Sequence, residues 1–222
     1  MATLTIPHVL LTVRGTVIPT GDELRELHNQ TAGSAEGVAA ARSLGDLSHK
    51  VYLPVPGLPG ASEKELLFID VWRDGQGLAT FFSDAQVQHG ASLLFSEREA
   101  AVWMPATGAF GFELDAPTDR PGRYVGIVRG PVSGPAEATA VFAELMALHL
   151  ADARRRGQLS HQLYVSLPQP DAVTEVLGID VWADPAGMGE HYAQLSGFER
   201  AFSGEPATSV WHADSGGQWT EW

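Results

Sequence analysis

The sequence of 222 residues contains no cysteine. A disulfide framework, a thiolate metal site and a cysteine nucleophile are therefore excluded. The chain also lacks the ligand spacings H-E-x-x-H and H-x-H and any close cluster of carboxylates, so we expect no metal site. It has neither a glycine-rich dinucleotide fingerprint nor a P-loop, which argues against nucleotide cofactors. Chemistry must come from His, Asp, Glu, Arg, Tyr or Trp, or from a bound guest molecule.

Basic residues are scarce as well. Lys and Arg number 14 against 27 Asp and Glu, which gives a formal net charge of −13 and a pI near 4.9. Binding to phosphate backbones needs clustered Lys and Arg, so we expect neither nucleic acid nor a membrane surface as a partner. No apolar run approaches the roughly 20 residues that cross a bilayer, and Met1–Leu11 lacks the basic start of a secretory signal. The expectation is a cytoplasmic globular protein.

The clearest positive feature is an internal repeat. Ala41–Leu53 is answered by Ala153–Val165, and both follow A-R-x-x-G-x-L-S-H-x-φ-Y-φ, where φ is aliphatic. Three more blocks recur in the same order: Val13–Gly15 with Val128–Gly130, Ile69–Trp72 with Ile179–Trp182, and Val102–Trp103 with Val210–Trp211. This self-similarity predicts two homologous halves. Because Pro105–Gly122 has the Pro- and Gly-rich composition of a connector, we divide the chain into a first repeat with connector, 1–118, and a second repeat, 119–222.

Each half predicts the order β-α-β-β-α-β. In the first half we expect strands at His8–Val17, Ser48–Leu53, Leu66–Trp72 and Ala100–Pro105, and helices at Thr20–Leu44, opened by a Thr20–Glu23 capping box, and Gly77–Phe95. In the second half we expect strands at Tyr124–Val132, Leu159–Ser166, Val176–Trp182 and Ser209–His212, and helices near Pro135–Arg156 and Ala186–Phe202. This order is the ferredoxin-like motif, whose antiparallel sheet carries both helices on one face.

Side chains alternate in the predicted third strand. Leu67, Ile69 and Val71 point one way, and Phe68, Asp70 and Trp72 point the other. We expect the aliphatic side to face the helices. The side with the aromatic and the carboxylate, which recurs at Asp180 and Trp182, should then line a space between two sheets.

This arrangement resembles the dimeric α+β barrel superfamily, in particular the antibiotic biosynthesis monooxygenase-like (ABM) proteins. The likeness covers both halves, and the best local match is Val181–His191, continuing to Phe198, which looks like that family's strand-end Trp followed by a helix with His and then Phe. The first half departs from it, since Phe81 stands in the place of His191. The resemblance implies an α+β fold in which two tandem ferredoxin-like repeats form an intramolecular dimeric α+β barrel.

Two pairs of residues are candidates for catalysis. His49 and His161 stand in the same Ser-His pair of the repeat, and an imidazole suits proton abstraction from a phenol or quinol. Asp70 and Asp180 lie mid-strand, where an unpaired carboxylate is costly to bury, so they need partners, either Arg14 and Arg129 or the histidines. A structural histidine and a structural ion pair explain the same pattern, because features kept in both copies are those that the fold itself demands.

Other residues are candidates for contacts with a substrate. They are Trp72, Trp182, Arg14, Arg129, Tyr52, Tyr164, His191 and His212. The tryptophans fit either an aromatic box for a planar ligand or plain core packing. His191 and His212 have no copy in the first half, which is the asymmetry expected if only one of two pockets is functional; neutral drift explains it equally well.

Two functional hypotheses follow from the resemblance. The first is an ABM-like, cofactor-independent monooxygenase or related enzyme acting on a small aromatic or polyketide-like substrate. The second is a non-catalytic binding or stress-related protein of the same superfamily. We expect no cofactor, with heme left open through a single histidine, and a small molecule as the partner; self-association of the chain is also left open.

Overall fold

The computed structural model describes residues 8–58, 60–109, 111–113, 123–168, 172–214 and 218–222. The chain forms two compact units. The first unit comprises Met1–Pro54, Ser62–Val102 and Asp214–Trp222, and the second comprises Val55–Ala61 and Trp103–Ala213. The predicted boundary at residue 119 lies outside the described residues, so the division at 118/119 stays a prediction. Sequence reasoning did not foresee that residues 218–222 pack in the first unit.

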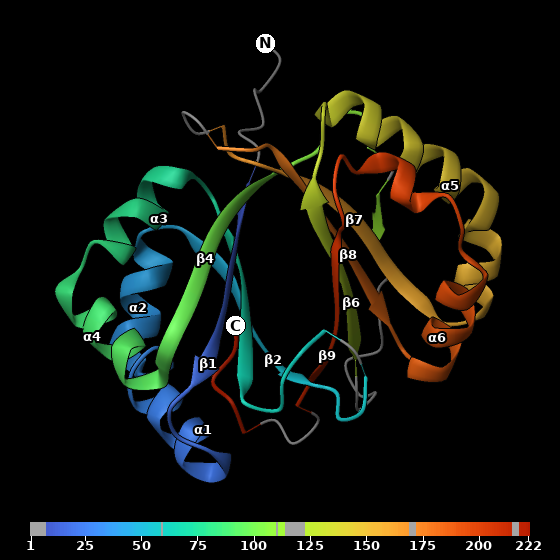
Figure 1. The fold of residues 1–222 in the computed structure, drawn as a ribbon. Helices are drawn as coiled ribbons and strands as arrows, with labels where there is room; N and C mark the ends of the chain where they lie inside the picture. Colours follow the sequence, from blue (N-terminus) through green and yellow to red (C-terminus); the bar gives the residue numbers. More distant parts are fainter. Residues whose placement is uncertain (1–7, 59, 110, 114–122, 169–171, 215–217) are drawn as a thin grey trace. The chain divides into compact units, whose positions relative to one another are not determined.

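The first unit has two helices after its first strand and two more after its third. Its elements are β1 (Val9–Val17), α1 (Gly21–Gln30), α2 (Ala35–Ser43), β2 (Asp46–Pro54), β3 (Glu65–Trp72), α3 (Gly75–Phe82), α4 (Ala85–Leu94) and β4 (Phe95–Pro105, in this unit through Val102). The strands lie in the order β4-β1-β3-β2, with β3 antiparallel to both β1 and β2. The four helices lie on one side of this sheet (Figure 1).

The second unit repeats this plan with fewer helices. Its elements are β5 (Phe112–Glu113), β6 (Tyr124–Pro131), α5 (Pro135–Arg155), β7 (Gln158–Ser166), β8 (Glu175–Trp182), α6 (Pro185–Gln194), the 3₁₀ helix η1 (Phe198–Ala201) and β9 (Ala207–Ala213). The strand order is β9-β6-β8-β7-β5. Trp103–Pro105, the end of β4, also pairs with β7. Both units therefore have the predicted β-α-β-β-α-β order within an α+β fold.

The strand register is the same in the two units. His49 of β2 stands opposite Asp70 of β3, and His161 of β7 stands opposite Asp180 of β8. Each histidine strand has an irregularity two residues before its histidine, between Asp46 and Ser48 in β2 and at the matching place in β7. The register therefore brings each histidine beside a carboxylate.

Several predicted elements differ from the structure. The helix expected near Ala186–Phe202 is α6, which ends at Gln194, followed by the separate 3₁₀ helix η1. The helix expected over Thr20–Leu44 is two helices, because Ser34 begins α2 by accepting a hydrogen bond from the Gly37 amide. The helix expected over Gly77–Phe95 is divided in the same way by Asp84, whose carboxylate caps α4. Thr20 does occupy the N-cap of α1, but its side chain makes no capping bond. The strand expected from Ala100 begins earlier, at Phe95.

The prediction about the two faces of the third strand is wrong. Phe68 lies 5.4 Å, between ring centroids, from His28 on α1, and Trp72 lies 5.4 Å from Phe81 on α3. In the second unit Trp182 lies 5.3 Å from His191 on α6. The aromatic and carboxylate side therefore faces the unit's own helices. It can be buried there because the rings supply apolar area and the carboxylates are paired.

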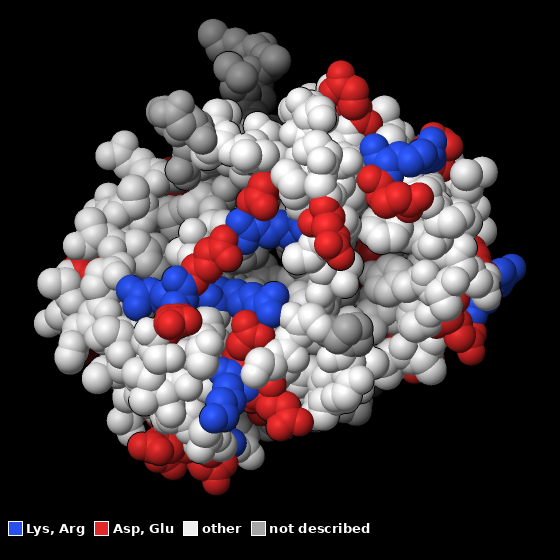
Figure 2. Space-filling model, viewed as in Figure 1, with Lys and Arg blue, Asp and Glu red and all other residues white. Residues whose placement is uncertain are grey.

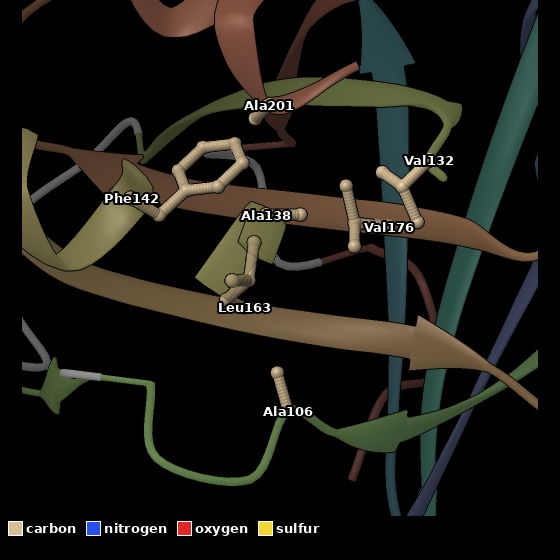
Figure 3. Close-up of a cluster of buried hydrophobic side chains, with 7 residues drawn as sticks. All are labelled: Ala106, Val132, Ala138, Phe142, Leu163, Val176 and Ala201. Carbon is tan, nitrogen blue, oxygen red and sulfur yellow. The ribbon is translucent and has the colours of Figure 1, made fainter. Parts of the chain in front are cut away.

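The core of the second unit joins α5, η1 and the sheet. Figure 3 shows seven buried side chains of this cluster: Ala106, Val132, Ala138, Phe142, Leu163, Val176 and Ala201. Leu163 on β7 is only two residues from His161, so the same packing that stabilises the unit also fixes the strand that carries the histidine.

We expect Leu163→Ala to lower the free energy of unfolding by about 2–5 kcal/mol, because it leaves a cavity in this cluster. Leu148→Ala is the matched control, since Leu148 on α5 is 68% exposed and its replacement should cost less than about 0.5 kcal/mol. Urea unfolding followed by circular dichroism measures both. Equal losses for the two variants would contradict this account of the core.

Candidate functional site

A buried imidazole and carboxylate form the centre of the second unit. His161 Nδ1 lies 2.6 Å from Asp180 Oδ1. The hydroxyl of Tyr192, on α6, donates to Asp180 Oδ2 at 2.7 Å, and the indole N–H of Trp182 donates to that hydroxyl at 3.3 Å. Asp180 thus accepts two bonds. His161 is 5% exposed, and within the described part of the chain its Nε2 has no hydrogen-bond partner.

The proton positions in this site follow from the carboxylate. An ionised carboxylate only accepts, so Nδ1 of His161 carries a proton and Nε2 of the neutral ring has a free lone pair. Burial, followed by the charge of Asp180, raises the pKa of Tyr192 well above its usual value, which keeps the phenol a donor. The site therefore holds one imidazole in a fixed tautomer whose Nε2 has no partner among the described residues.

Tyr192 reaches Asp180 over a glycine. Gly126 of β6 is the residue opposite Asp180 in the sheet. A Cβ at Gly126 would stand 2.4 Å from the Tyr192 hydroxyl oxygen, closer than side chains approach. The absent side chain at Gly126 is thus what allows the phenol to lie over the sheet.

The first unit has the same pair with a different neighbour. His49 Nδ1 lies 2.7 Å from Asp70 Oδ1, but its Nε2 lies 3.1 Å from Nε2 of His28 on α1. His28 Nδ1 in turn lies 3.0 Å from the side-chain oxygen of Asn29. That oxygen also accepts from the Thr220 amide, and the Asn29 amino group donates to the Gln218 carbonyl, which fixes the orientation of the amide.

These contacts assign the protons. Since the Asn29 oxygen only accepts, His28 Nδ1 is the donor and His28 Nε2 is the acceptor. His49 must then donate from both nitrogens, to Asp70 and to His28, and is an imidazolium. Burial and the neighbouring His49 lower the pKa of His28 to about 4. Burial opposes the charge of His49, but the charge and hydrogen bond of Asp70 outweigh it and raise the His49 pKa.

The two units therefore differ in what their histidine can do. Phe142 on α5 is a ring beside His161, at 6.5 Å, whereas His28 is one of the rings beside His49, at 5.3 Å. Phe142 cannot accept a hydrogen bond through a ring nitrogen, and within the described residues His161 Nε2 has no partner. His28 engages Nε2 of His49, so His49 has no lone pair to offer.

Another carboxylate lies near the first pair. Asp46 is 5% exposed, and burial together with the charge of Asp70 raises its pKa to about 7. Gln158 holds the same register position in the second unit. The first unit thus has a titratable group where the second has a neutral one.

The arginines that were predicted to pair with the two aspartates have other partners. Arg14 forms a two-point ion pair with Glu65, and Arg129 pairs with Glu175 and lies 5.0 Å over the ring of Trp103. The histidines, and not the arginines, are the partners of Asp70 and Asp180. On the face shown in Figure 2, Lys and Arg side chains likewise have Asp or Glu beside them.

The remaining residues predicted to contact a substrate lie on two different faces of their sheets. Trp72 and Trp182 are fully buried under the helices, as core packing would have them. Tyr52 is three residues after His49 and so lies on the opposite face of β2, and Tyr164, whose hydroxyl bonds Gln162, does so on β7.

The two histidines that have no copy in the first half, His191 and His212, also lie apart from the imidazole–carboxylate pairs. His191 Nδ1 is 3.5 Å from Asp152, and burial lowers its pKa. His212 Nδ1 lies 3.2 Å from the Ala213 carbonyl. The His191 ring packs on Trp182, whose indole N–H donates to Tyr192 of the site.

Sequence reasoning missed several members of both sites: His28, Asn29, Asp46, Tyr192 and residues 218–222. His28 had one available signal, because it follows Leu24 by four residues on the buried side of α1. Tyr192 directly follows His191 and gave no separate signal. Residues 218–222 are distant in sequence from the unit in which they pack.

Comparisons with known proteins bear on the fold. No family model matches the chain, and no curated protein matches it. Solved structures do: an anthrone oxidase-like protein (14% identity, TM-score 0.59, covering 96% of this chain and 94% of that one); a putative monooxygenase from Fusobacterium nucleatum (10%, 0.58, 93% and 92%); and a DypB variant from Rhodococcus jostii in complex with heme (13%, 0.56, 96% and 95%). These are dimeric α+β barrel proteins, and the chain shares their fold.

Among the described residues, no helix is long and apolar enough to span a membrane. Within the same residues, no three His, Asp or Glu side chains are grouped so that they could hold a metal ion.

The protonation of His28 gives a testable pH dependence. Its pKa is about 4 in the fold against 6.5 unperturbed, so the unfolded chain binds this proton more readily, and folding is opposed as the pH falls from 6.5 to 4. The shift corresponds to about 3 kcal/mol. His28→Phe removes this penalty but leaves His49 without its acceptor. We expect the variant to be less stable than the wild type at pH 7.5 and to lose most of that deficit at pH 4.5.

Chemical denaturation of both proteins at the two pH values measures the difference. Comparing variant with wild type cancels the contribution of Asp46, whose raised pKa acts in the opposite direction over the same range. A deficit that is the same at pH 7.5 and 4.5 would show that His28 is not held neutral.

Proposed function

We propose that this protein is an ABM-like, cofactor-independent monooxygenase acting on a small aromatic or polyketide-like substrate, with His161 as its base. The observation that carries the proposal is the buried His161 ring, whose Nδ1 is fixed by Asp180 and whose Nε2 has no partner among the described residues. A positioned histidine imidazole is the commonest general base in proteins. The shared fold with an anthrone oxidase-like protein and a putative monooxygenase is consistent with this chemistry.

In the proposed reaction the substrate supplies the electrons. His161 removes a proton from an acidic phenol or from a CH₂ group between aromatic rings, and the resulting anion reacts with O₂. The CH₂ becomes a carbonyl, one oxygen atom enters the product, and the other leaves as water. Asp180 holds the imidazolium that forms, and the Tyr192 hydroxyl fixes the carboxylate so that it need not reorganise during the proton transfer.

The proposed role of the histidine differs between the two halves of the chain. His49 and Asp70 were expected to be equivalent to His161 and Asp180, but an imidazolium that donates from both nitrogens cannot accept a proton. We therefore assign catalysis to the second unit. The matching register of the units supports a tandem duplication of ferredoxin-like repeats in which one copy kept the base. A cytoplasmic location and self-association remain proposals.

The test uses an anthrone as substrate and an oxygen electrode. We expect the wild type to consume one O₂ per anthrone without added metal or cofactor, and His161→Gln to lower the rate by about 10²–10⁴-fold. His49→Gln is the matched control, because it alters the same register position of the other unit, and it should keep most of the activity. Equal rates for wild type and His161→Gln would overturn the assignment of the base.

Heme binding is the second candidate function. A histidine whose Nδ1–H is held by a carboxylate is also a typical metal ligand, and the DypB variant with the same fold is in complex with heme. If the protein binds heme, His161 would hold the iron through Nε2, and the group would supply redox chemistry in place of the base.

A hemin titration separates the two candidates. Heme ligation by His161 predicts a saturable shift of the Soret band that His161→Gln removes and His49→Gln leaves in place. The monooxygenase proposal predicts no such shift and activity in colourless protein.

A further inference from the structure

Residues 218–222 cover the titratable cluster of the first unit, and we name them the covering segment. Its indole rings lie against both histidines of the cluster. Trp222 stacks on His49 with ring centroids 4.8 Å apart and an interplanar angle of 27°, and Trp219 meets His28 edge-on at 5.0 Å. A planar aromatic ring thus already lies on the imidazole of the first pair.

The covering segment is held by polar contacts on each side of these rings. The amide and carbonyl of His49 bond the carbonyl and amide of Trp222, at 2.7 and 3.2 Å. Asn29 binds the main chain of the segment at Gln218 and at Thr220, both at 2.8 Å. A carboxylate oxygen of Glu221 accepts from the Val51 amide at 2.7 Å. The segment therefore binds much as an extended peptide ligand would.

The surface beneath the covering segment carries more titratable groups than the fold requires. The second unit forms the same sheet register with Phe142 beside its histidine and Gln158 at the start of its strand, where the first unit has His28 and Asp46. Burying such groups is costly and gives the sheet nothing that the second unit lacks. This excess of polar side chains is typical of a binding site and not of packing alone.

One contact between the covering segment and this surface is incomplete. The indole N–H of Trp222 faces the Asp46 carboxyl closely enough to lower its pKa, against the larger effects that raise it, yet within the described residues it forms no full hydrogen bond. Asp46 therefore retains capacity to accept a bond. A ligand ring with a hydroxyl or N–H that reached Asp46 would satisfy it better than Trp222 does.

From this geometry we infer that the first unit contains a binding site for a flat aromatic molecule with an O–H or N–H donor, which Trp222 occupies from within the chain. Such a molecule would stack on His49 and donate to Asp46, and it would compete with the covering segment. The site is separate from the base proposed at His161 and does not depend on it.

The charged groups that face the site come from each element packed around it. They are Asp46 and His49 on β2, Asp70 on β3, His28 on α1, and Glu221 of the covering segment, with Lys50 3.9 Å from Glu221. The pKa of His28 is lowered to about 4, that of Asp46 is raised to about 7 and that of His49 is raised, so binding should be measured at one fixed pH.

The test is calorimetric binding of 2-naphthol to full-length variants at pH 7.5. Trp222→Ala vacates the stacking position and should bind one molecule of 2-naphthol, whereas the wild type and Trp222→Phe, which keeps a ring on His49, should bind at least about tenfold more weakly. In Trp222→Ala, adding Asp46→Asn should cost about another tenfold, because the naphthol hydroxyl loses a charged acceptor.

A second route guards against a variant that fails to fold. Asn29→Ala keeps Trp222 but removes two anchors of the covering segment, and it should bind 2-naphthol with intermediate affinity. Equal affinity of Trp222→Ala and Trp222→Phe would overturn the inference. Binding that is indifferent to Asp46→Asn would also overturn it, since a plain apolar cavity would then explain the result. Oxygen uptake by the same variants tests the function of His161 independently.

Discussion

The bond between an imidazole and a carboxylate on neighbouring strands is the interaction on which both units depend. It allows an aspartate to lie in the middle of a sheet and beneath helices, where an unpaired charge would destabilise the fold by several kcal/mol. In each unit the antiparallel register sets the two residues opposite one another, so the pair forms wherever the strands align. The two units differ, among other places, at the second nitrogen of the histidine and the second oxygen of the aspartate.

Those two atoms have opposite surroundings. In the second unit the outer carboxylate oxygen is held by Tyr192, and the outer nitrogen has no partner in the part of the chain that the structure describes. In the first unit the outer nitrogen donates to His28, and the ring stays charged. The helix residue beside the histidine also differs, with Phe142 in the second unit and His28 in the first.

The sequence predicted the α+β class and, in each half, the two strands that carry the histidine and the aspartate. The repeat and its Ser-His and Ile-Asp-Val-Trp blocks located the histidine and aspartate of each pair, because strand periodicity and register are local properties. The prediction of which face of the third strand the helices cover was wrong. The alternation of side chains separates the two faces but does not say which of them the helices cover, and here they cover the aromatic face. The breaks between α1 and α2 and between α3 and α4 were missed, since they depend on single capping side chains at Ser34 and Asp84.

The covering segment has a consequence for how the chain acquires its structure. Residues 218–222 follow the whole second unit in sequence, yet they pack against His28 and His49 of the first. During synthesis from the N-terminus, the strands of the first unit leave the ribosome more than a hundred residues before the rings that cover its buried charges. Until then the cluster lacks this cover. The half that starts folding first is therefore the half that is completed last.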